Sequence, residues 1–316
     1  MSVAWLFPGQ GSQFVGMGSD VFARSEAARS VLERADAVLG ESLSSLIREG
    51  PDERLTLTVN AQPAILATCC AILAAIRERF PELPRPALGA GHSLGEYSAL
   101  VAADALSLDD AVRIVRARGR AMQEAVAPGT GAMTAVMGLD TDRLEAICAL
   151  AAQGDVVGPA NFNAPGQIVV AGHAAAVARV SELVAAAKGR AVSLKVSAPF
   201  HCALMAPAAR ILEKELAPVV VRPLSFPVVA NFDGCANDDA TRVKELLVRQ
   251  VDGPVRWEAS VRLMVSRGVT HALEIGPGKV LSGLAKRIAK DLQVLSVGDG
   301  AALEQVGSFV RGAGGG

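Results

Sequence analysis

The 316-residue sequence has little of what marks several classes of protein. Its formal net charge is −1 and no region is dense in Lys and Arg, which removes any general electrostatic case for binding nucleic acid. Charge or proline interrupts the apolar stretches before the roughly 20 residues that a membrane span needs. The first residues lack a basic start before a long apolar run, so we expect no signal peptide and no membrane contact.

Cysteines are also few. Five of them, an odd number without metal-ligand spacing, indicate reduced thiols in a cytoplasmic protein and no metal site. Hydrophobic residues make up 51% and charged residues 20%, which is typical of a globular chain and excludes disorder. The length suits one large core, or one domain that carries a smaller insert.

What the sequence does have is the nucleophile-elbow pattern Gly-His-Ser-Leu-Gly at residues 91–95. A run of small residues typical of a buried strand precedes it, and a helix-compatible run follows. Glycines two residues before and after a turn residue let neighbouring backbone pass closely, and a strand that turns directly into a helix strains that residue. The pattern predicts an exposed nucleophile at Ser93, although a glycine turn with a serine N-cap has the same letters.

The order of the predicted elements indicates two domains. Residues 129–197 read strand, helix, strand, strand, helix, strand, which is the ferredoxin-like order. Residues 1–128 and 198–316 alternate strands with helices, which predicts a mostly parallel sheet in an α/β-hydrolase-like large domain. We therefore expect an α/β fold with an inserted small domain, a ligand cleft between the two, and a frayed glycine-rich tail from Gly312.

A serine nucleophile needs a base, and the sequence offers four histidines. His201 is favoured, because it lies in the loop that returns from the insert and is expected to face the cleft. His92 is expected to point away from Ser93. His173 is interpreted as a solvated or capping residue, and His271 as a satisfied core residue. No Asp or Glu stands out as a third triad member, and a backbone carbonyl can orient an imidazole equally well.

Six motifs stand in a definite order along the chain: Phe7 to Gln13, Gly91 to Glu96, Arg116 to Gln123, Asn161 to Gln167, Ala198 to His201 and Glu274 to Lys279. Malonyl-CoA:acyl carrier protein transacylases have these motifs in the same order, and the chain resembles this family from about residue 3 to residue 296. The resemblance implies a dyad of Ser93 and His201, with the imidazole oriented by the main-chain carbonyl of Gln250 on a late loop. It also implies an oxyanion hole formed by the backbone amides of Gln10 and Leu94, and elbow geometry independently places a donor at Leu94.

The same resemblance assigns residues to substrate selection. It implies that Arg118 holds the malonyl carboxylate by two parallel hydrogen bonds. Phe200 resembles the malonyl-type pattern, and Asn163 resembles a position that lines the cleft, although asparagine before Ala-Pro-Gly is also an ordinary turn former. A basic rim for an acidic carrier is a further hypothesis, weighed against an ordinary solvated face; its candidates are Lys279, Lys286, Arg287 and Lys290.

The implied activity is a ping-pong transfer of a malonyl group from malonyl-CoA, through an ester on Ser93, to the phosphopantetheine thiol of acyl carrier protein in fatty acid synthesis. No cofactor is expected beyond the coenzyme A thioester and the carrier's phosphopantetheine, and nothing requires more than a monomer. The alternatives are a discrete polyketide-type acyltransferase or a malonate-metabolising complex, a serine esterase or thioesterase with the same elbow, and a non-catalytic carrier-binding domain.

Overall fold

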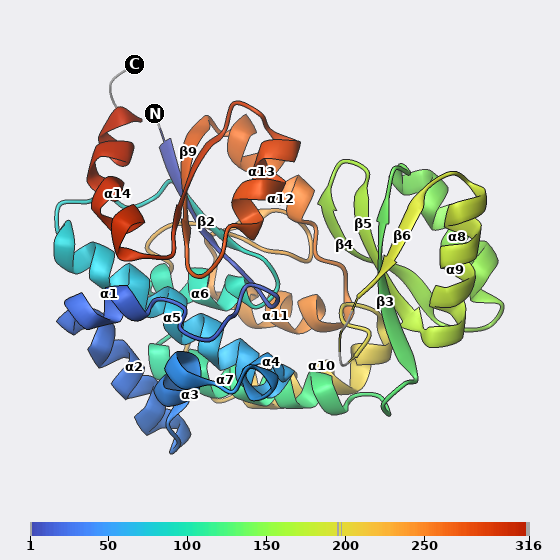
Figure 1. Ribbon diagram of the computed structural model, residues 1–316, viewed down its shortest axis with the longest axis horizontal. Coiled ribbons are helices and arrows are strands. Elements are labelled where there is room, and N and C mark those ends of the chain that lie inside the picture. The colour runs from blue at the N-terminus through green and yellow to red at the C-terminus, as the bar shows by residue number, and fades with distance from the viewer. Residues whose placement is uncertain (1, 195, 197, 314–316) are drawn as a thin grey trace.

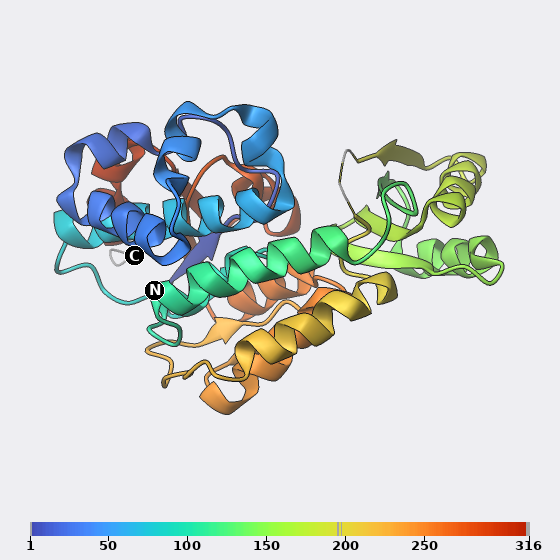
Figure 2. The same cartoon turned by 90° about the horizontal axis from the view of Figure 1, so that it is seen from below.

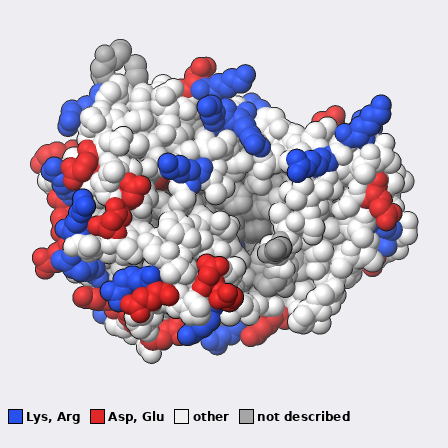
Figure 3. Space-filling model, viewed as in Figure 1, with Lys and Arg blue, Asp and Glu red and all other residues white. Residues whose placement is uncertain are grey.

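The computed structural model describes residues 2–194, 196 and 198–313. The predicted domain boundary at residue 197 and the last residues of the glycine-rich tail therefore lie outside the described residues. Two sheets, each with its own helices, form a larger and a smaller body (Figure 1). Figure 3 shows a hollow between these two bodies.

The larger sheet has six strands in the order β10-β9-β1-β2-β7-β8. All neighbouring pairs are parallel except β7 with β8, which is an antiparallel pair at one edge. This arrangement confirms the predicted α/β class with a mostly parallel sheet. The strands are β1 Ser2–Phe7, β2 Leu88–Gly91, β7 Val228–Val229, β8 Ala236–Asn237, β9 Val269–Ile275 and β10 Gln293–Val297.

The side chains of strand β1 contribute to two hydrophobic cores, one on each face of the larger sheet. Trp5 and Phe7 belong to the core that lies against α2, α5, α6 and α7, whereas Ala4 and Leu6 pack with Trp257 and with α13 on the other face. Successive side chains of a strand point to opposite faces, so a fully apolar strand requires helices on both sides. The helices of the larger body are α1 Ser19–Arg24, α2 Glu26–Leu39, α3 Leu43–Glu49, α4 Asp52–Thr56, α5 Thr58–Arg79, α6 Gly95–Ala102, α7 Leu108–Glu124, α10 Ala206–Leu216, α11 Val243–Asp252, α12 Trp257–Ser266, α13 Val280–Ile288 and α14 Gly300–Gly312, with short 3-10 turns at Ala203–Met205 and Ala240–Arg242.

Helix α5 is the apolar centre of the larger body. It is long and apolar enough by composition to cross a membrane, but 83% of its most apolar window is buried inside the molecule, as in the core helix of a folded domain. The apolar run predicts a helix over residues 60–79 with Pro63 in its first turn. The helix instead begins at Thr58, because the Asn60 and Ala61 amides bond to the Leu57 carbonyl. Pro63 therefore lies inside the helix.

Capping residues set the ends of several helices. The Ser25 side chain accepts the Ala28 amide at the start of α2, and Gly40 ends that helix with φ 65°, as predicted. Helices α1, α3 and α4 and strand β8 were not predicted, because each is too short to show a period. Helix α14 was also not predicted, although Asp299 caps it by accepting the Ala302 amide.

The smaller sheet has four antiparallel strands in the order β4-β5-β3-β6. Val136 and Ile168 on one face pack against its two helices, whereas Met133 and Val169 on the other face turn to the hollow. The sequence predicts a strand over residues 156–161; strand β4 runs three residues further, to Ala164, with two register irregularities. The elements are β3 Gly131–Met137, α8 Thr141–Ala152, β4 Val157–Ala164, β5 Gln167–His173, α9 Ala174–Ala186 and β6 Arg190–Ser193. Figure 2 shows α7 running from the larger body to the base of this sheet.

Candidate active site

A cavity of about 840 Å³ lies between the two bodies and collects residues from both. The larger body supplies the elbow, the loop after β1 and part of α7, and the smaller body supplies residues of β3, β4 and β5. Gln250 lies behind the wall of this cleft and is fully buried. The predicted site residues that line the cleft are Gln10, Ser93, Leu94, Arg118, Asn163, Phe200 and His201.

Ser93 stands on a strained turn between β2 and α6. Its φ is 50°, in the left-handed region that residues other than glycine seldom adopt. The flanking glycines are needed for space: a Cβ on Gly91 would lie 1.9 Å from the carbonyl carbon of Gly95, and a Cβ on Gly95 would lie 2.0 Å from the carbonyl oxygen of Phe7. The structure therefore has the strand–turn–helix geometry that the elbow pattern predicts.

The Ser93 hydroxyl and the His201 imidazole are in direct contact. Ser93 Oγ lies 2.8 Å from His201 Nε2, and His201 Nδ1 lies 2.8 Å from the main-chain oxygen of Gln250. A carbonyl can only accept, so Nδ1 carries the proton and Nε2 is left to accept the proton of the serine. Burial, helped by the Arg118 charge, lowers the pKa of His201 to about 3. The imidazole is therefore neutral near pH 7, the form that a general base requires.

The position of Gln250 corrects the expectation of a loop. Gln250 lies in the last turn of α11. The last four carbonyls of a helix have no partner within the helix, so this oxygen is available to the imidazole. A helix end thus supplies the fixed acceptor, where a triad would have a carboxylate.

Arg118 is the one fully buried arginine among the four of α7, with 2% of its surface exposed. Nη1 donates to Gln62 Oε1 at 2.8 Å, and Nη2 donates to Gln250 Oε1 at 2.9 Å and to Ser93 Oγ at 3.1 Å. Burial lowers the pKa of the guanidinium, which nevertheless stays charged. All three hydrogen-bond partners are neutral, so the cation at the cleft wall is suited to an anionic group on the serine. Arg113 and Arg120 are exposed, and Arg116 pairs with Glu41.

Gln10 and Leu94 lie on the same wall of the cleft. Leu94 directly follows the nucleophile at the start of α6, where the first amides of a helix have no internal acceptor. Within the described ranges, neither main-chain amide donates a hydrogen bond to another residue. The Gln10 side chain is fixed by donating to Thr58 Oγ1 at 3.1 Å.

His92 and Asn163 form a contact that the sequence did not predict. Asn163 Oδ1 lies 2.8 Å from His92 Nε2, which joins the elbow to β4 of the smaller body. His92 lines the cleft and its ring packs on Trp257, so it belongs to the site, although its side-chain partners differ from those of Ser93. The turn at Ser93 leaves the regular strand, so strand alternation no longer fixes where the His92 ring points.

The remaining residues that the sequence singled out are Phe200, His173 and His271. Phe200 is 8% exposed and forms the cleft wall directly before His201. His173 does not cap α9; its Nδ1 accepts the Val156 amide at 3.0 Å. His271 is half-buried on β9, where its ring packs edge-on against Phe309.

Three polar residues behind the site were missed from the sequence: Gln62, Glu96 and Asn231. Asn231 Oδ1 accepts the Ser93 amide at 2.6 Å, and its Nδ2 donates to the Gly91 carbonyl at 2.7 Å, so it holds both sides of the elbow. A signal existed for the other two residues. Gln62 and Glu96 are polar residues near the start of mostly apolar helices.

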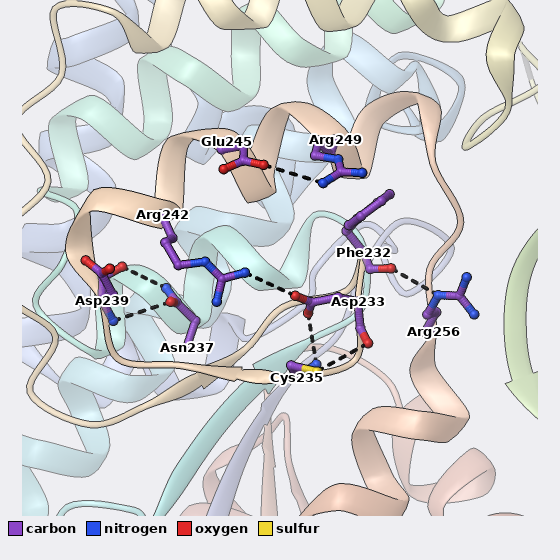
Figure 4. A network of polar contacts seen from close by, with 9 residues as sticks. All are labelled: Phe232, Asp233, Cys235, Asn237, Asp239, Arg242, Glu245, Arg249 and Arg256. Atoms are coloured by element: carbon purple, nitrogen blue, oxygen red, sulfur yellow. Dashed lines mark hydrogen bonds and ion pairs between the residues drawn. The ribbon is translucent and has the colours of Figure 1, made fainter.

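The loop that carries Asn231 is fastened to α11 by polar contacts at the surface (Figure 4). Arg242 pairs with Asp233 at 3.5 Å, and the Arg249 guanidinium lies 4.1 Å from the Phe232 ring centroid. Arg256 Nε donates to the Phe232 carbonyl at 3.1 Å, and the Arg256 amide donates to the Asn231 carbonyl at 2.9 Å. These contacts fix the loop relative to the helix that supplies Gln250.

A serine on an elbow, a neutral histidine in contact with it and a buried cation beside it define the class of enzymes that transfer acyl groups through a serine ester. A family model described as acyl transferase domain matches residues 4–315. Malonyl CoA-acyl carrier protein transacylases of Haemophilus influenzae and Bacillus subtilis are 46% and 47% identical, over 97% and 96% of this chain and 98% and 95% of their own lengths.

Two solved structures are also similar to this chain over almost its whole length. An acyl carrier protein S-malonyltransferase from Vibrio cholerae superposes with a TM-score of 0.94 at 46% identity, covering 97% of this chain and all of that chain. The malonyl-transacylase in a complex with a type II PKS acyl-carrier protein gives a TM-score of 0.94 at 44% identity, covering 96% and 98%. The chain belongs to the malonyl CoA-acyl carrier protein transacylase family.

Proposed function

We propose that this protein transfers a malonyl group from malonyl-CoA to the phosphopantetheine thiol of acyl carrier protein, in fatty acid synthesis. One observation carries the proposal. Ser93 Oγ lies 2.8 Å from a neutral imidazole and 3.1 Å from a buried guanidinium. The first group makes the hydroxyl a nucleophile, and the second attracts an acyl group that ends in a carboxylate.

In the first half-reaction His201 Nε2 takes the proton of Ser93 while Oγ attacks the thioester carbonyl. The amides of Gln10 and Leu94 hold the oxyanion of the tetrahedral intermediate. The carbon–sulfur bond then breaks, His201 returns its proton to the sulfur of coenzyme A, and a malonyl ester remains on Ser93.

In the second half-reaction the carrier's thiol gives its proton to His201 and attacks the ester, and Ser93 leaves as the alcohol. Arg118 holds the malonyl carboxylate in both halves. The Phe200 wall selects against a branch methyl, a discrimination that is typically worth about 1–3 kcal/mol. Asn163 supports the elbow from the smaller body through His92.

We also propose the domain organisation that serves this chemistry. Residues 129–197 form a ferredoxin-like domain inserted into an α/β-hydrolase-like large domain of residues 1–128 and 198–316. The strand order of the smaller sheet supports the first assignment, and the strand–elbow–helix unit supports the second. The protein works as a cytoplasmic monomer without a cofactor of its own.

Intact-mass spectrometry after mixing with malonyl-CoA, without carrier, tests the function. We expect a long-lived malonyl adduct on the wild-type protein, no adduct on Ser93→Ala, little adduct from acetyl-CoA, and discharge of the malonyl adduct by holo acyl carrier protein. Rapid turnover without carrier would indicate an esterase or thioesterase instead. Absence of any adduct on the folded wild-type protein would indicate a non-catalytic carrier-binding domain.

A polyketide carrier is a second candidate acceptor. The 44%-identical malonyl-transacylase in a complex with a type II PKS acyl-carrier protein favours it. Discharge rates of the malonyl adduct by a fatty-acid carrier and by a polyketide carrier separate the two pathways.

A further inference from the structure

A buried carboxylate that the mechanism does not use lies directly behind the elbow. Glu96 is in the first turn of α6, three residues after Ser93, and is 3% exposed. In the described part of the chain it forms no ion pair. Its Oε2 accepts the Asn231 amide at 2.9 Å and Gln250 Nε2 at 2.8 Å. Burying a carboxylate without an ion pair costs free energy, so its presence here indicates that these two hydrogen bonds serve a function.

Both partners of Glu96 hold reacting groups. Asn231 accepts the Ser93 amide, and Gln250 accepts the His201 imidazole on its main chain and the Arg118 guanidinium on its side chain. Gln250 Nε2 also donates to the Ser93 carbonyl at 2.9 Å. Each of the three site residues is therefore separated from one carboxylate oxygen by a single intervening residue.

The charge of Glu96 also helps to hold the Gln250 side-chain amide in one orientation. An ionised carboxylate only accepts and therefore takes the Nε2 end, and a guanidinium only donates and therefore takes the Oε1 end. The amide dipole is thus aligned between an anion and a cation. A neutral group in place of the carboxylate weakens the hold on the Nε2 group, which keeps its hydrogen bond to the Ser93 carbonyl.

We propose that Glu96, in its ionised form, is the positioning residue of this site. Through Asn231 it fixes the elbow, and through Gln250 it fixes the Arg118 guanidinium, which the Gln250 side chain accepts, and the His201 imidazole, which the Gln250 main chain accepts. The proposal rests on the malonyl transfer proposed above and deepens it, because it names the residue that couples nucleophile, base and carboxylate-binding cation.

The titration of Glu96 gives the proposal a signature. Burial raises the pKa of Glu96 to about 7, against the opposing effects of the Asn231 and Gln250 hydrogen bonds and the Arg118 charge. The titration of His201 does not change the rate near pH 7, because burial lowers the pKa of this imidazole to about 3. The acylation rate should therefore fall as pH falls through about 7. The titratable groups that act on Glu96 are Arg118, which lowers its pKa, and Asp233, which raises it, and Glu96 in turn adds to the raised pKa of Tyr97.

The stability of the fold should change with pH in the direction opposite to the acylation rate. The folded-state pKa of Glu96 lies above the ordinary value of 4.5, so this residue contributes stability at low pH that is lost as pH rises through about 7. The unfolding free energy of the wild type, relative to that of Glu96→Gln, should therefore decrease from about pH 5 to about pH 8. Activity and stability then change in opposite directions because of one group.

Single-turnover acylation of Ser93 tests the proposal with two reagents from about pH 5 to about pH 9. Malonyl-CoA needs the nucleophile, the base and Arg118, whereas a fluorophosphonate lacks the carboxylate and needs only the nucleophile and the base. Glu96→Gln keeps the volume and loses the charge. We expect the substitution to slow the reaction of Ser93 with both reagents by about ten- to a hundredfold at high pH. We also expect it to abolish the fall in rate near pH 7, which is the acid limb of the pH profile.

The matched control is Glu274→Gln. Glu274 is also a fully buried carboxylate, but it accepts the Leu281 and Ser282 amides at the start of α13 and none of the site residues. This variant should keep the pH limb, whatever its effect on stability.

Several outcomes contradict the proposal. They are a Glu96→Gln protein that reacts as fast as the wild type, a loss confined to one of the two reagents, or a limb that survives the substitution. Circular dichroism shows whether Glu96→Gln folds. If it does not, the dependence of the wild-type acylation rate on pH provides the test, and a rate that does not fall near pH 7 contradicts the proposal. A wild type that forms no malonyl adduct refutes the proposed function, whereas an adduct formed equally well by Glu96→Gln refutes only this inference.

Discussion

Burial decides which arginine of α7 faces the chemistry. Arg113, Arg116, Arg118 and Arg120 have the same charge and close positions, but only Arg118 turns inward. It lies three and four residues from Val115 and Ile114, which are buried on the same face of the helix. The helical period thus contained the signal, although the sequence did not distinguish an inward arginine from an ordinary charge at the edge of the apolar face.

Arg118→Ala should remove the preference for malonyl over acetyl groups. The variant loses the charge-assisted hydrogen bonds to the carboxylate, so we expect kcat/KM for malonyl-CoA to fall by about a hundredfold while acetyl transfer changes little. Initial rates with both thioesters measure this change, and Arg120→Ala, exposed on the same helix, is the control. An unchanged malonyl preference would rule out this role for Arg118.

His201 should make the fold less stable in acid. Its folded-state pKa of about 3 lies below the ordinary 6.5, so the unfolded chain binds more protons as pH falls through 6.5. We expect the wild type to lose about 2 kcal/mol more unfolding free energy than His201→Gln between pH 6.5 and about pH 5. Urea denaturation of both proteins at the two pH values provides the comparison. Parallel losses would show that the imidazole is not desolvated.

At the scale of elements, the β2–elbow–α6 unit depends on close backbone approach. The two elbow glycines are in extended or helical backbone, and no positive φ requires them. They are required because β1 and the start of α6 pass through the space that a side chain would fill. This explains why a five-residue pattern predicts a three-dimensional arrangement: only glycine lets the strand, the turn and the helix pack so tightly.

Gly95→Ala should therefore destabilise the protein or prevent folding. Its Cβ would lie 2.0 Å from the Phe7 carbonyl oxygen, a backbone atom of the central strand, and we expect a loss of at least about 3 kcal/mol. Gly283→Ala is the matched control, since its Cβ meets nothing within 4 Å on the exposed side of α13 and should stabilise the helix by up to about 1 kcal/mol. Thermal unfolding of both variants measures the difference, and similar melting temperatures would contradict the steric argument.

At the scale of the whole molecule, helix α13 is placed at the mouth of the cleft. Val280, Leu281 and Leu284 line the cavity, and Arg287 donates to the Gln167 side chain of the smaller body. Figure 3 shows Lys and Arg side chains along the upper edge of the hollow. A carrier with an acidic surface would meet this edge before its phosphopantetheine arm reaches Ser93.

Reversing charge on this edge should weaken carrier use. For the double variant Lys286→Glu and Arg287→Glu we expect the KM for acyl carrier protein to rise by roughly tenfold at low salt, and by less at high salt because ions screen the attraction. Steady-state kinetics with varied carrier measures it, with Arg48→Glu, on α3 outside the cleft lining, as control. An unchanged KM would remove the docking hypothesis.

The short-range features of this protein can be read from the sequence alone. The elbow, the alternating strands and helices and the capped helix α2 follow from residues within a few positions of one another, because glycine spacing, side-chain period and capping act locally. His201 could be favoured for its loop, and a family resemblance was needed to choose Arg118 and Gln250.

Which polar groups meet depends on how distant segments pack in the folded chain. Gln250 joins Ser93 across 157 positions and Arg118 across 132, and Glu96 reaches Asn231 across 135. No local pattern encodes such contacts. Whether a buried amide, carboxylate or guanidinium is satisfied depends on which distant segment packs against it, and that is settled when the sheet and its helices close around the site.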